Sequence, residues 1–401
     1  MAGKRVFVTG LGAISAIGSN ARENLNSLLN SEHGIAPVSL FETRNNHLMV
    51  GEVKKSNTEL ITELGIDPDG AYTRTTLLGL MAAKEAYKHA NLSDNSAWKT
   101  GLISATSVGG MGETEKYYYD YLDKDEHLDL IETHDCADST EQIADYLGIK
   151  DYLGTISTAC SSAPNAIMMG ARLIKAGKMD RMVVGGTDAL SKFTLNGFNT
   201  LMILDSKHSR PFDATRAGLN LGEGAGFIIL ESEDVVEAEN KTTLAEIRGY
   251  GNANDAHHQT ASSPEGNGAF FAMNAAFQVG GVSPSEINYI NVHGTGTENN
   301  DQSEGTAIRR IFPNELPPFS SVKSFTGHTL AAAGGLEAVY SVLAIQEGCI
   351  YPNLNFKNPI EGLNMIPETN AQKGLEINHV LSNSFGFGGN CTSLIFSKSE
   401  V

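Results

Sequence analysis

Short runs of β-branched and other apolar residues alternate along the chain with longer segments of small apolar residues. The first half opens with "RVFVTGLGAIS", continues into "TTLLGLMAAKEAYKHA" (Thr75 to Ala90) and then into "GLISATSVGGM". Apolar runs bounded by glycine predict buried strands, whereas the longer segment repeats its apolar positions at helical spacing. Alternating strands and helices predict parallel β/α layers, so we expect an α/β fold.

The same kinds of element recur in the same order in the second half. Each half contains an opening strand, a helix, a further strand, a strand-to-helix unit and a final strand that runs into glycines. The second copy reads "LAEIRGYGNAND", "GAFFAMNAAFQVG", "INYINVHGTGT", "PPFSSVKSFTGHTLAAAGGLEAVYSVLAI" and "NHVLSNSFGFGGN". A polar, acidic stretch, "ESEDVVEAENKTT", separates the copies. We therefore expect a duplicated unit with halves at 1–240 and 241–401.

The strand-to-helix unit of each half predicts a helix that is buried nearly all round. In "TACSSAPNAIMMGARLI" the residues after Cys160 are small or apolar on almost every face. Pro164 is tolerated only in the first turn, so this helix begins at about Ser161 or Ser162. The partner segment "LAAAGGLEAVYSVLAI" is equally small and apolar. Two such helices in equivalent positions would pack centrally, with their N-termini near a shared site.

Composition and charge narrow the classes of function. The chain has 401 residues and a net charge of −18, which argues against nucleic acid as a partner because phosphates require a basic face. Its four cysteines are scattered, as in a reduced cytosolic protein without disulfides or a thiolate metal site. No apolar run approaches the ~20 residues of a membrane span, and the N-terminus has no signal-peptide pattern. We expect a cytoplasmic protein.

Candidate chemistry begins with Cys160. A thiol at a helix N-terminus faces unpaired N–H groups and the positive end of the helix dipole, both of which favour the nucleophilic thiolate. The small neighbouring residues leave room for a substrate carbonyl, and free N–H groups can hold an oxyanion. Taken alone, such a cysteine is more often a buried, inert side chain.

Two histidines strengthen the functional interpretation. His293 lies in "NVHGTGT" and His328 in "SFTGHTL", both in glycine-rich turns of the second half. The repeat places them on the same side of the sheets as Cys160, and α/β active sites lie at the carboxyl ends of strands. Competing motifs are incomplete: "TGLGAIS" has Ser15 where a dinucleotide fingerprint needs glycine, and "GEGAG" lacks the Lys-Ser/Thr of a phosphate loop.

At this point several motifs match one family. The chain resembles β-ketoacyl-acyl-carrier-protein synthases of the elongating type (KAS I/II-like), with a Cys-His-His site. The motifs that carry the resemblance are "TACSS", "RPFDATRAGLNLGEGAG", "NDAHHQTASSPEGNG", "HGTGTENNDQSE", "SVKSFTGHTLAAAGGLEAV" and "NSFGFGGN". It implies a duplicated thiolase-like fold, usually in a homodimer, with a heterodimer as the other possibility.

The resemblance implies a decarboxylative Claisen condensation. Cys160 takes the acyl chain from an acyl carrier protein, while His293 and His328 assist decarboxylation of malonyl carrier protein. The chemistry suits these residues, because thioester exchange needs a good nucleophile and an enolate needs hydrogen-bond donors. No metal or other cofactor is implied.

The resemblance also implies supporting roles. The backbone N–H groups of Cys160 and Phe387 match an oxyanion hole. The other matching positions are a gate at Phe387 with Phe385 beside it, supporting charges at Lys323 and Glu337, and pantetheine-contacting hydroxyls at Thr295 and Thr297.

The sequence departs from housekeeping members of this family in several places. It reads "GFGGNC", with Asn390 and Cys391, where they commonly read "GFGGTN", and it has Glu113 and Thr114 where an apolar residue often lines the acyl pocket. The segment "THDCADST" is unusually polar. These details resemble synthases of aryl-polyene or flexirubin-type pigment pathways, with ordinary fatty-acid elongation as the alternative. If these polar residues line the pocket, we expect short or polyunsaturated chains as substrates, since burying unpaired polar groups is costly.

Two other functions stay open. A non-catalytic partner like a chain-length factor typically lacks the nucleophile, and an acyl-CoA thiolase carries a second active-site cysteine, for which Cys391 is the candidate. Carrier proteins of this family are acidic, so docking on an acidic chain would need a local basic patch. Arg74, Lys207 and Arg210 are the candidates for that patch.

Overall fold

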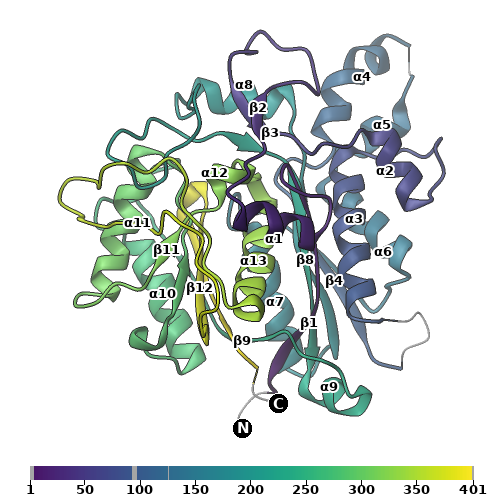
Figure 1. The fold of residues 1–401 in the computed structure, drawn as a ribbon. Coiled ribbons are helices and arrows are strands. Elements are labelled where there is room, and N and C mark those ends of the chain that lie inside the picture. The colour runs from purple at the N-terminus through teal and green to yellow at the C-terminus, as the bar shows by residue number, and fades with distance from the viewer. Residues whose placement is uncertain (1–3, 93–96, 125, 400–401) are drawn as a thin grey trace.

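The computed structural model describes residues 4–92, 97–124 and 126–399 (Figure 1). Ten strands form the main sheet. Those of the first half are β1 (Val6–Ser15), β4 (Thr100–Ala105), β5 (Tyr152–Ile156), β6 (Arg181–Asp188) and β8 (Gly224–Ser232). Those of the second half are β9 (Ala245–Asn254), β10 (Tyr289–Asn291), β11 (Phe319–Ser320), β12 (His379–Phe385) and β13 (Asn390–Ser397). A small second sheet contains β2 (Ile35–Pro37), β3 (Met49–Gly51) and β7 (Leu221–Gly222).

The strand order confirms the duplication. Across the main sheet it is β11-β10-β12-β13-β9-β1-β8-β6-β4-β5. Read outwards from the β9–β1 junction, each half contributes its first, fifth, fourth, second and third strand in that order. Strands β1 and β9 join the halves through a short antiparallel pairing of Phe7 with Glu246 and Val8 with Ala245. The exact boundary at 240/241 stays a prediction.

The sheet is mixed, whereas the sequence predicted parallel layers. Strand β8 is antiparallel to β1 and β6, and β13 is antiparallel to β12 and β9. In the second half the reason is direct, because residues 386–389 connect β12 to β13 in one tight turn. A tight turn permits only antiparallel pairing, since parallel strands need a crossover.

The helices form layers around the sheet. They are α1 (Ala21–Leu29), α2 (Asn57–Leu64), α3 (Arg74–His89), α4 (Met111–Lys124), α5 (Leu128–Glu132), α6 (Cys136–Leu147), α7 (Ser162–Lys175), α8 (Lys192–Thr200), α9 (Glu233–Glu239), α10 (Asn267–Gly280), α11 (Glu298–Ile311), α12 (Lys323–Thr326) and α13 (Ala333–Glu347), with 3-10 turns η1 (Pro284–Glu286), η2 (Leu330–Ala332) and η3 (Phe387–Gly389). Figure 1 shows α3 and α6 outside the first-half strands and α10 and α11 outside those of the second half. None of the helices within the described ranges has the length and apolar character needed to cross a membrane.

The two central helices pack as the sequence predicts. Helix α7 contacts β6 and β13, and α13 contacts β8 and β12, so both lie between the two halves (Figure 1). Helix α7 begins at Ser162 with Pro164 in its first turn. A Cβ on Gly334 would lie 2.2 Å from Cγ of Pro164, so only glycine lets the two helix starts approach this closely. That approach brings both N-termini to one place.

Candidate active site

Cys160, His293 and His328 line one cavity of about 360 Å³. Cys160 follows β5, His293 follows β10 and His328 follows α12. All three side chains are buried, and the two imidazole centroids lie 5.4 Å apart in an edge-to-face arrangement. The structure therefore brings together the three residues that the sequence singled out, although they come from both halves of the chain.

The Cys160 thiol sits in a tight backbone environment. Ala159 adopts a left-handed φ of +54°, a conformation that costs about 1–3 kcal/mol and persists only where the surroundings impose it. The backbone N–H groups of Cys160 and Phe387 both face the sulfur. Each lowers the pKa of the thiol, and so does the nearby charge of Lys323.

The N–H groups favour the thiolate as the sequence predicted, but burial outweighs them. Burial is the largest effect on Cys160, and it raises the pKa of the thiol to about 12 despite those favourable contacts. The sequence revealed the helix end but not the depth at which the sulfur lies. At neutral pH the thiol is therefore protonated.

Both histidines are neutral at physiological pH. Burial, followed by the charge of Lys323, lowers the pKa of His328 to about 3 and that of His293 well below its usual value. The backbone N–H of Leu330 donates to Nδ1 of His328 at 3.1 Å, so the neutral ring carries its proton on Nε2. Among the described residues, the buried Nδ1 of His293 has no hydrogen-bond partner. Two uncharged imidazoles thus face the cavity.

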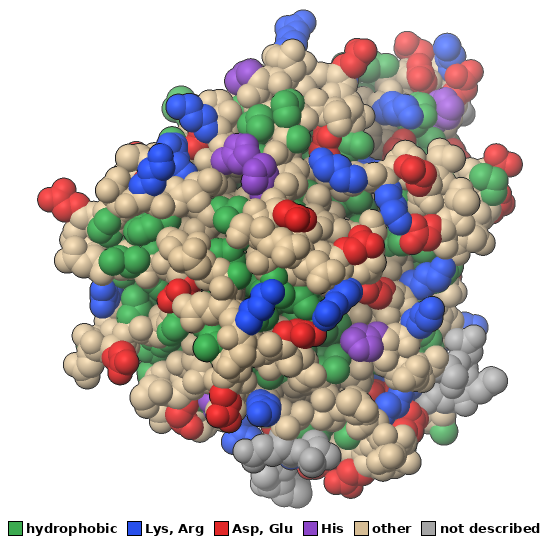
Figure 2. Space-filling view, viewed as in Figure 1, with side chains coloured by type: hydrophobic (Ala, Val, Ile, Leu, Met, Phe, Trp, Pro, Cys, Tyr) green, Lys and Arg blue, Asp and Glu red, His purple; other side chains and the backbone are tan. Residues whose placement is uncertain are grey.

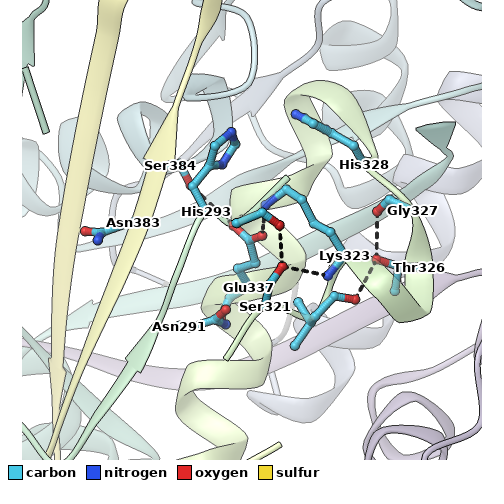
Figure 3. Close-up of polar contacts among 12 residues, drawn as sticks. Asn291, His293, Ser321, Lys323, Thr326, Gly327, His328, Glu337, Asn383 and Ser384 are labelled. Atoms are coloured by element: carbon cyan, nitrogen blue, oxygen red, sulfur yellow. Dashed lines mark hydrogen bonds and ion pairs between the residues drawn. The ribbon is translucent and has the colours of Figure 1, made fainter. Parts of the chain in front are cut away.

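Lys323 and Glu337 form a buried ion pair behind the histidines (Figure 3). Nζ of Lys323 contacts Oε1 of Glu337, and Oγ of Ser384 donates to Oε2 at 3.3 Å. Burial raises the pKa of Glu337, and the charge of Lys323 opposes that rise. Neither residue lines the cavity, so their influence on the reaction is electrostatic.

Buried carboxylates that the sequence reasoning missed hold the histidine turn. Oε1 of Glu304 accepts from the backbone N–H of His293, and Oε2 accepts from Gly294, both at 2.8 Å. Oδ2 of Asp301 accepts from the backbone N–H of Phe212 at 2.8 Å. A signal was available, because these acids lie three residues apart on α11, directly after the histidine motif.

Asp188 has a similar positioning role at the end of β6. Its carboxylate accepts from the backbone N–H groups of Ser107 at 3.0 Å and Ala331 at 2.8 Å, and from Oγ1 of Thr106. Burial raises its pKa to about 6. It therefore ties the loop after β4 to the turn that follows His328.

The predicted gate and pantetheine residues also line the cavity. The Phe387 ring stacks on the Phe198 ring with centroids 5.8 Å apart. The ring centroids of Phe385 and His293 lie 5.7 Å apart. The hydroxyls of Thr295 and Thr297 are 2.9 Å apart. Thr297 also caps α11, so part of its hydroxyl capacity is structural.

The polar residues considered for the acyl pocket do not line the catalytic cavity. Glu113 and Thr114 are half-buried on α4, and Oγ1 of Thr114 is 2.8 Å from Nδ1 of His134. Neither they nor the "DCAD" segment lines the catalytic cavity. Cys391 packs into the apolar cluster under α10 rather than into the cavity.

Two of the three docking candidates are engaged in ion pairs. The Arg74 guanidinium is bound to the buried Glu223, and Arg210 donates to Asp205 at 2.8 Å. Lys207 is exposed. Figure 2 shows basic and acidic side chains interspersed on the face it presents, without a broad basic patch there.

Comparisons with known proteins agree with this geometry. The family models described as "Beta-ketoacyl synthase, N-terminal domain" and "C-terminal domain" match residues 3–235 and 244–357. A "3-oxoacyl-[acyl-carrier-protein] synthase 2" of Staphylococcus aureus (strain N315) is 33% identical over 415 residues, covering 99% of both chains.

Three solved structures are similar over nearly the whole chain. The ishigamide ketosynthase/chain length factor gives a TM-score of 0.93 at 29% identity, covering 100% of both chains. A type II polyketide synthase acyl-carrier protein in complex with its ketosynthase (AntDE:AntF) gives 0.87 at 26%, covering 99% and 100%. The ketosynthase ApeO in complex with its chain length factor ApeC from Xenorhabdus doucetiae gives 0.85 at 30%, covering 99% and 98%.

Proposed function

The chain belongs to the β-ketoacyl synthase family, and from that premise we propose how Cys160, His293 and His328 divide one condensation between them. The enzyme is a ketoacyl synthase that lengthens acyl chains by Claisen condensation on an acyl carrier protein. The observation that carries the division of roles is a single cavity where one thiol faces two neutral imidazoles.

In the first step Cys160 accepts the acyl chain. Its sulfur attacks the carrier thioester, the bond from the acyl carbon to the pantetheine sulfur breaks, and the thiol proton goes to the departing thiolate. The carbonyl oxygen becomes negatively charged between the N–H groups of Cys160 and Phe387. Preorganised donors of this kind are worth about 10²–10³ in rate each.

In the second step the histidines act on the malonyl thioester. The Nε2–H of His328 and the ring of His293 bind its carbonyl oxygen, the bond to the carboxylate carbon breaks, and carbon dioxide leaves. The resulting enolate carbon attacks the acyl carbon on Cys160. The new carbon–carbon bond forms as Cys160 departs, and the sulfur regains a proton from solvent. No step requires a metal or a nicotinamide.

Mass spectrometry provides the direct test. Incubation with acyl carrier thioester should add one acyl group to Cys160, and malonyl carrier protein should then remove it as a 3-ketoacyl product. Condensation of two acetyl thioesters without malonyl thioester would instead indicate a thiolase. That alternative is disfavoured because Cys391, its candidate second cysteine, lies outside the cavity. The non-catalytic alternative is disfavoured because Cys160 is present.

We also propose the setting in which the enzyme works. Acyl carrier protein is the partner in one similar structure, and chain length factors occur in two others, which supports a carrier-dependent enzyme in a homodimer or in a heterodimer with such a factor. We propose a cytoplasmic enzyme of fatty-acid or polyene elongation. Competition between hexadecanoyl and short dienoyl carrier thioesters tests the pathway, and faster extension of the saturated chain would contradict the polyene assignment.

A further inference from the structure

The two N–H groups that face the Cys160 sulfur come from distant parts of the chain. One belongs to Cys160 itself, just before α7, and the other belongs to Phe387, in the turn between β12 and β13. The segments pack closely, since a Cβ on Gly386 would lie 2.8 Å from the carbonyl oxygen of Thr158 and 3.2 Å from the nitrogen of Cys160. An oxyanion site built from two segments works only if their relative position is held.

Asn390 contacts both segments at once. Its backbone carbonyl accepts from the N–H of Gly386 at 2.8 Å, which closes the turn that presents Phe387. Its side-chain Oδ1 accepts from Oγ of Ser161 at 2.7 Å, directly beside the nucleophile. We propose that Asn390 is a positioning residue that sets the oxyanion site by tying the Phe387 turn to the start of α7.

The side-chain oxygen of Asn390 collects further donors. Nδ2 of Asn165, on α7, donates to it at 2.8 Å, and Nδ2 of Asn252, on β9, donates at 2.9 Å. Asn165 is itself buried and also donates to Oγ1 of Thr158 at 2.9 Å. The amide oxygen is thus the shared acceptor of a network that includes α7, β9 and β13. Asn165 is buried, Asn390 half-buried and Asn252 exposed, so the network runs from the interior to the surface. Several bonds to one acceptor fix its position more firmly than one isolated bond.

Ser161 makes the arrangement sensitive to Asn390. Its hydroxyl oxygen lies 2.7 Å from Oδ1 of Asn390 and 2.8 Å from the carbonyl oxygen of Thr158, but it carries one proton. Without the Asn390 acceptor, that proton would bond to Thr158 alone. Ser161, beside the nucleophile, would then lose its tie to the opposite half of the molecule. Helix α7 would keep the bonds that Oδ1 of Asn165 accepts from Thr392 at 2.7 Å and Asn252 at 3.0 Å.

The consequence is specific to one part of the reaction, and it rests on the proposed function. Acyl transfer and condensation both place negative charge on the acyl-Cys160 oxygen, between the two N–H groups. Decarboxylation of the malonyl thioester places charge near the histidines instead. Loss of the Asn390 tie should therefore slow acyl transfer and condensation and leave decarboxylation unchanged.

The test compares Asn390→Leu with Asn254→Leu. Asn254 pairs with Asn390 across strands β9 and β13. It is exposed and has no part in the network around Asn390, so it is the matched control. We expect N390L to slow condensation about tenfold, less than the ~10²–10³ for full loss of an oxyanion donor. Its malonyl decarboxylation rate should stay within about twofold of wild type. N254L should match wild type in both assays.

A double-mutant cycle with Ser161→Ala examines the route of the effect. If Asn390 acts through Ser161, the double variant should condense no more slowly than the slower single variant. Should N390L fail to fold, Ser161→Ala alone tests the same bond and should also slow condensation selectively.

The outcomes separate this inference from the proposed function. Equal losses of condensation and decarboxylation in N390L, or additive losses in the cycle, would overturn the positioning role. So would an N390L enzyme that condenses at the wild-type rate. A wild-type enzyme that forms no ketoacyl product would instead overturn the proposed function itself.

Discussion

Helices α7 and α13 occupy equivalent places in the two halves, yet their N-termini present different chemistry. Each is preceded by a non-glycine residue with a left-handed φ, Ala159 at +54° and Leu330 at +53°. Before α7 that bend presents a thiol to two N–H groups. Before α13 it places the Leu330 N–H on Nδ1 of His328.

This difference separates a group that must react from a group that must stay in place. The N–H groups near Cys160 remain directed at its sulfur, where an acyl oxygen can replace the thiol as their acceptor. The turn at His328 is held on both sides, by Leu330 on the ring and by Asp188 on Ala331. The two halves supply similar frameworks, and local hydrogen bonding gives one a thiol whose N–H neighbours can change acceptor and the other an imidazole held in place.

Replacing Cys160 should separate the proposed roles of the two helix N-termini most clearly. We expect Cys160→Ala to lower condensation at least ~10³-fold, because no covalent acyl intermediate can form. Malonyl decarboxylation should persist within about threefold, since the histidines are untouched. Cys391→Ala, at a buried cysteine outside the cavity, is the control and should retain condensation. Equal loss of both reactions in Cys160→Ala would contradict the division of roles.

The converse prediction concerns His328, the proposed hydrogen-bond donor to the enolate. His328→Ala should lower malonyl decarboxylation ~10²–10³-fold, the usual cost of removing a donor to a developing enolate. The rate of Cys160 acylation, measured by mass spectrometry, should stay within about threefold of wild type. His328→Asn, whose side-chain N–H can still donate, should recover part of the rate. A His328→Ala enzyme that decarboxylates normally but cannot be acylated would reverse the assignment.

The buried Lys323 should add to the effect of burial on how His328 responds to pH. With the pKa of His328 at about 3, wild-type decarboxylation should be flat between about pH 5.5 and 8, because the ring is neutral throughout. In Lys323→Met the loss of the cation raises the pKa of both imidazoles. Their protonation then reaches into the acidic part of that range and lowers the rate.

We expect a loss of less than about fourfold at pH 6 in Lys323→Met relative to pH 8, because burial still holds both imidazole pKa values below the ordinary value of about 6.5. Lys175→Met, at the far end of α7, should keep the flat profile. A wild-type profile with an acid limb near the ordinary histidine pKa would show that Lys323 does not hold the rings neutral.

The sequence predicted the general design because repeated patterns are local. The duplicated order of elements, the two central helices and the convergence of Cys160 with His293 and His328 all follow from periodicity and motif position. The prediction of parallel layers was wrong for β8 and β13, because an apolar run has the same pattern in a parallel and in an antiparallel pair.

Properties that depend on depth or on distant partners could not be read in the same way. Burial raises the pKa of Cys160 above the range that its helix end alone suggests. Arg74 resembled a free docking charge, but its partner Glu223 lies 149 positions away in the chain. Asn390 was visible as a departure from the family pattern, while its contact with Ser161 required the folded chain.

The smallest expected effect concerns Lys207, which lies in the loop between Asp205 and Arg210, the two members of an ion pair. Lys207 is exposed, so reversing its charge should not disturb the core, whereas Arg210→Glu would also leave the buried Asp205 without its partner. We expect Lys207→Glu to raise the KM for carrier-bound malonyl substrate about two- to threefold, because a single exposed charge contributes little to docking. Turnover of a small malonyl thioester should not change, and the KM difference should shrink with added salt, because exposed charges are screened. Because docking precedes the choice between the thiol and the imidazoles, acyl transfer and decarboxylation should be affected equally. An effect on only one of the two steps would place Lys207 near one end of the site rather than on a shared docking surface.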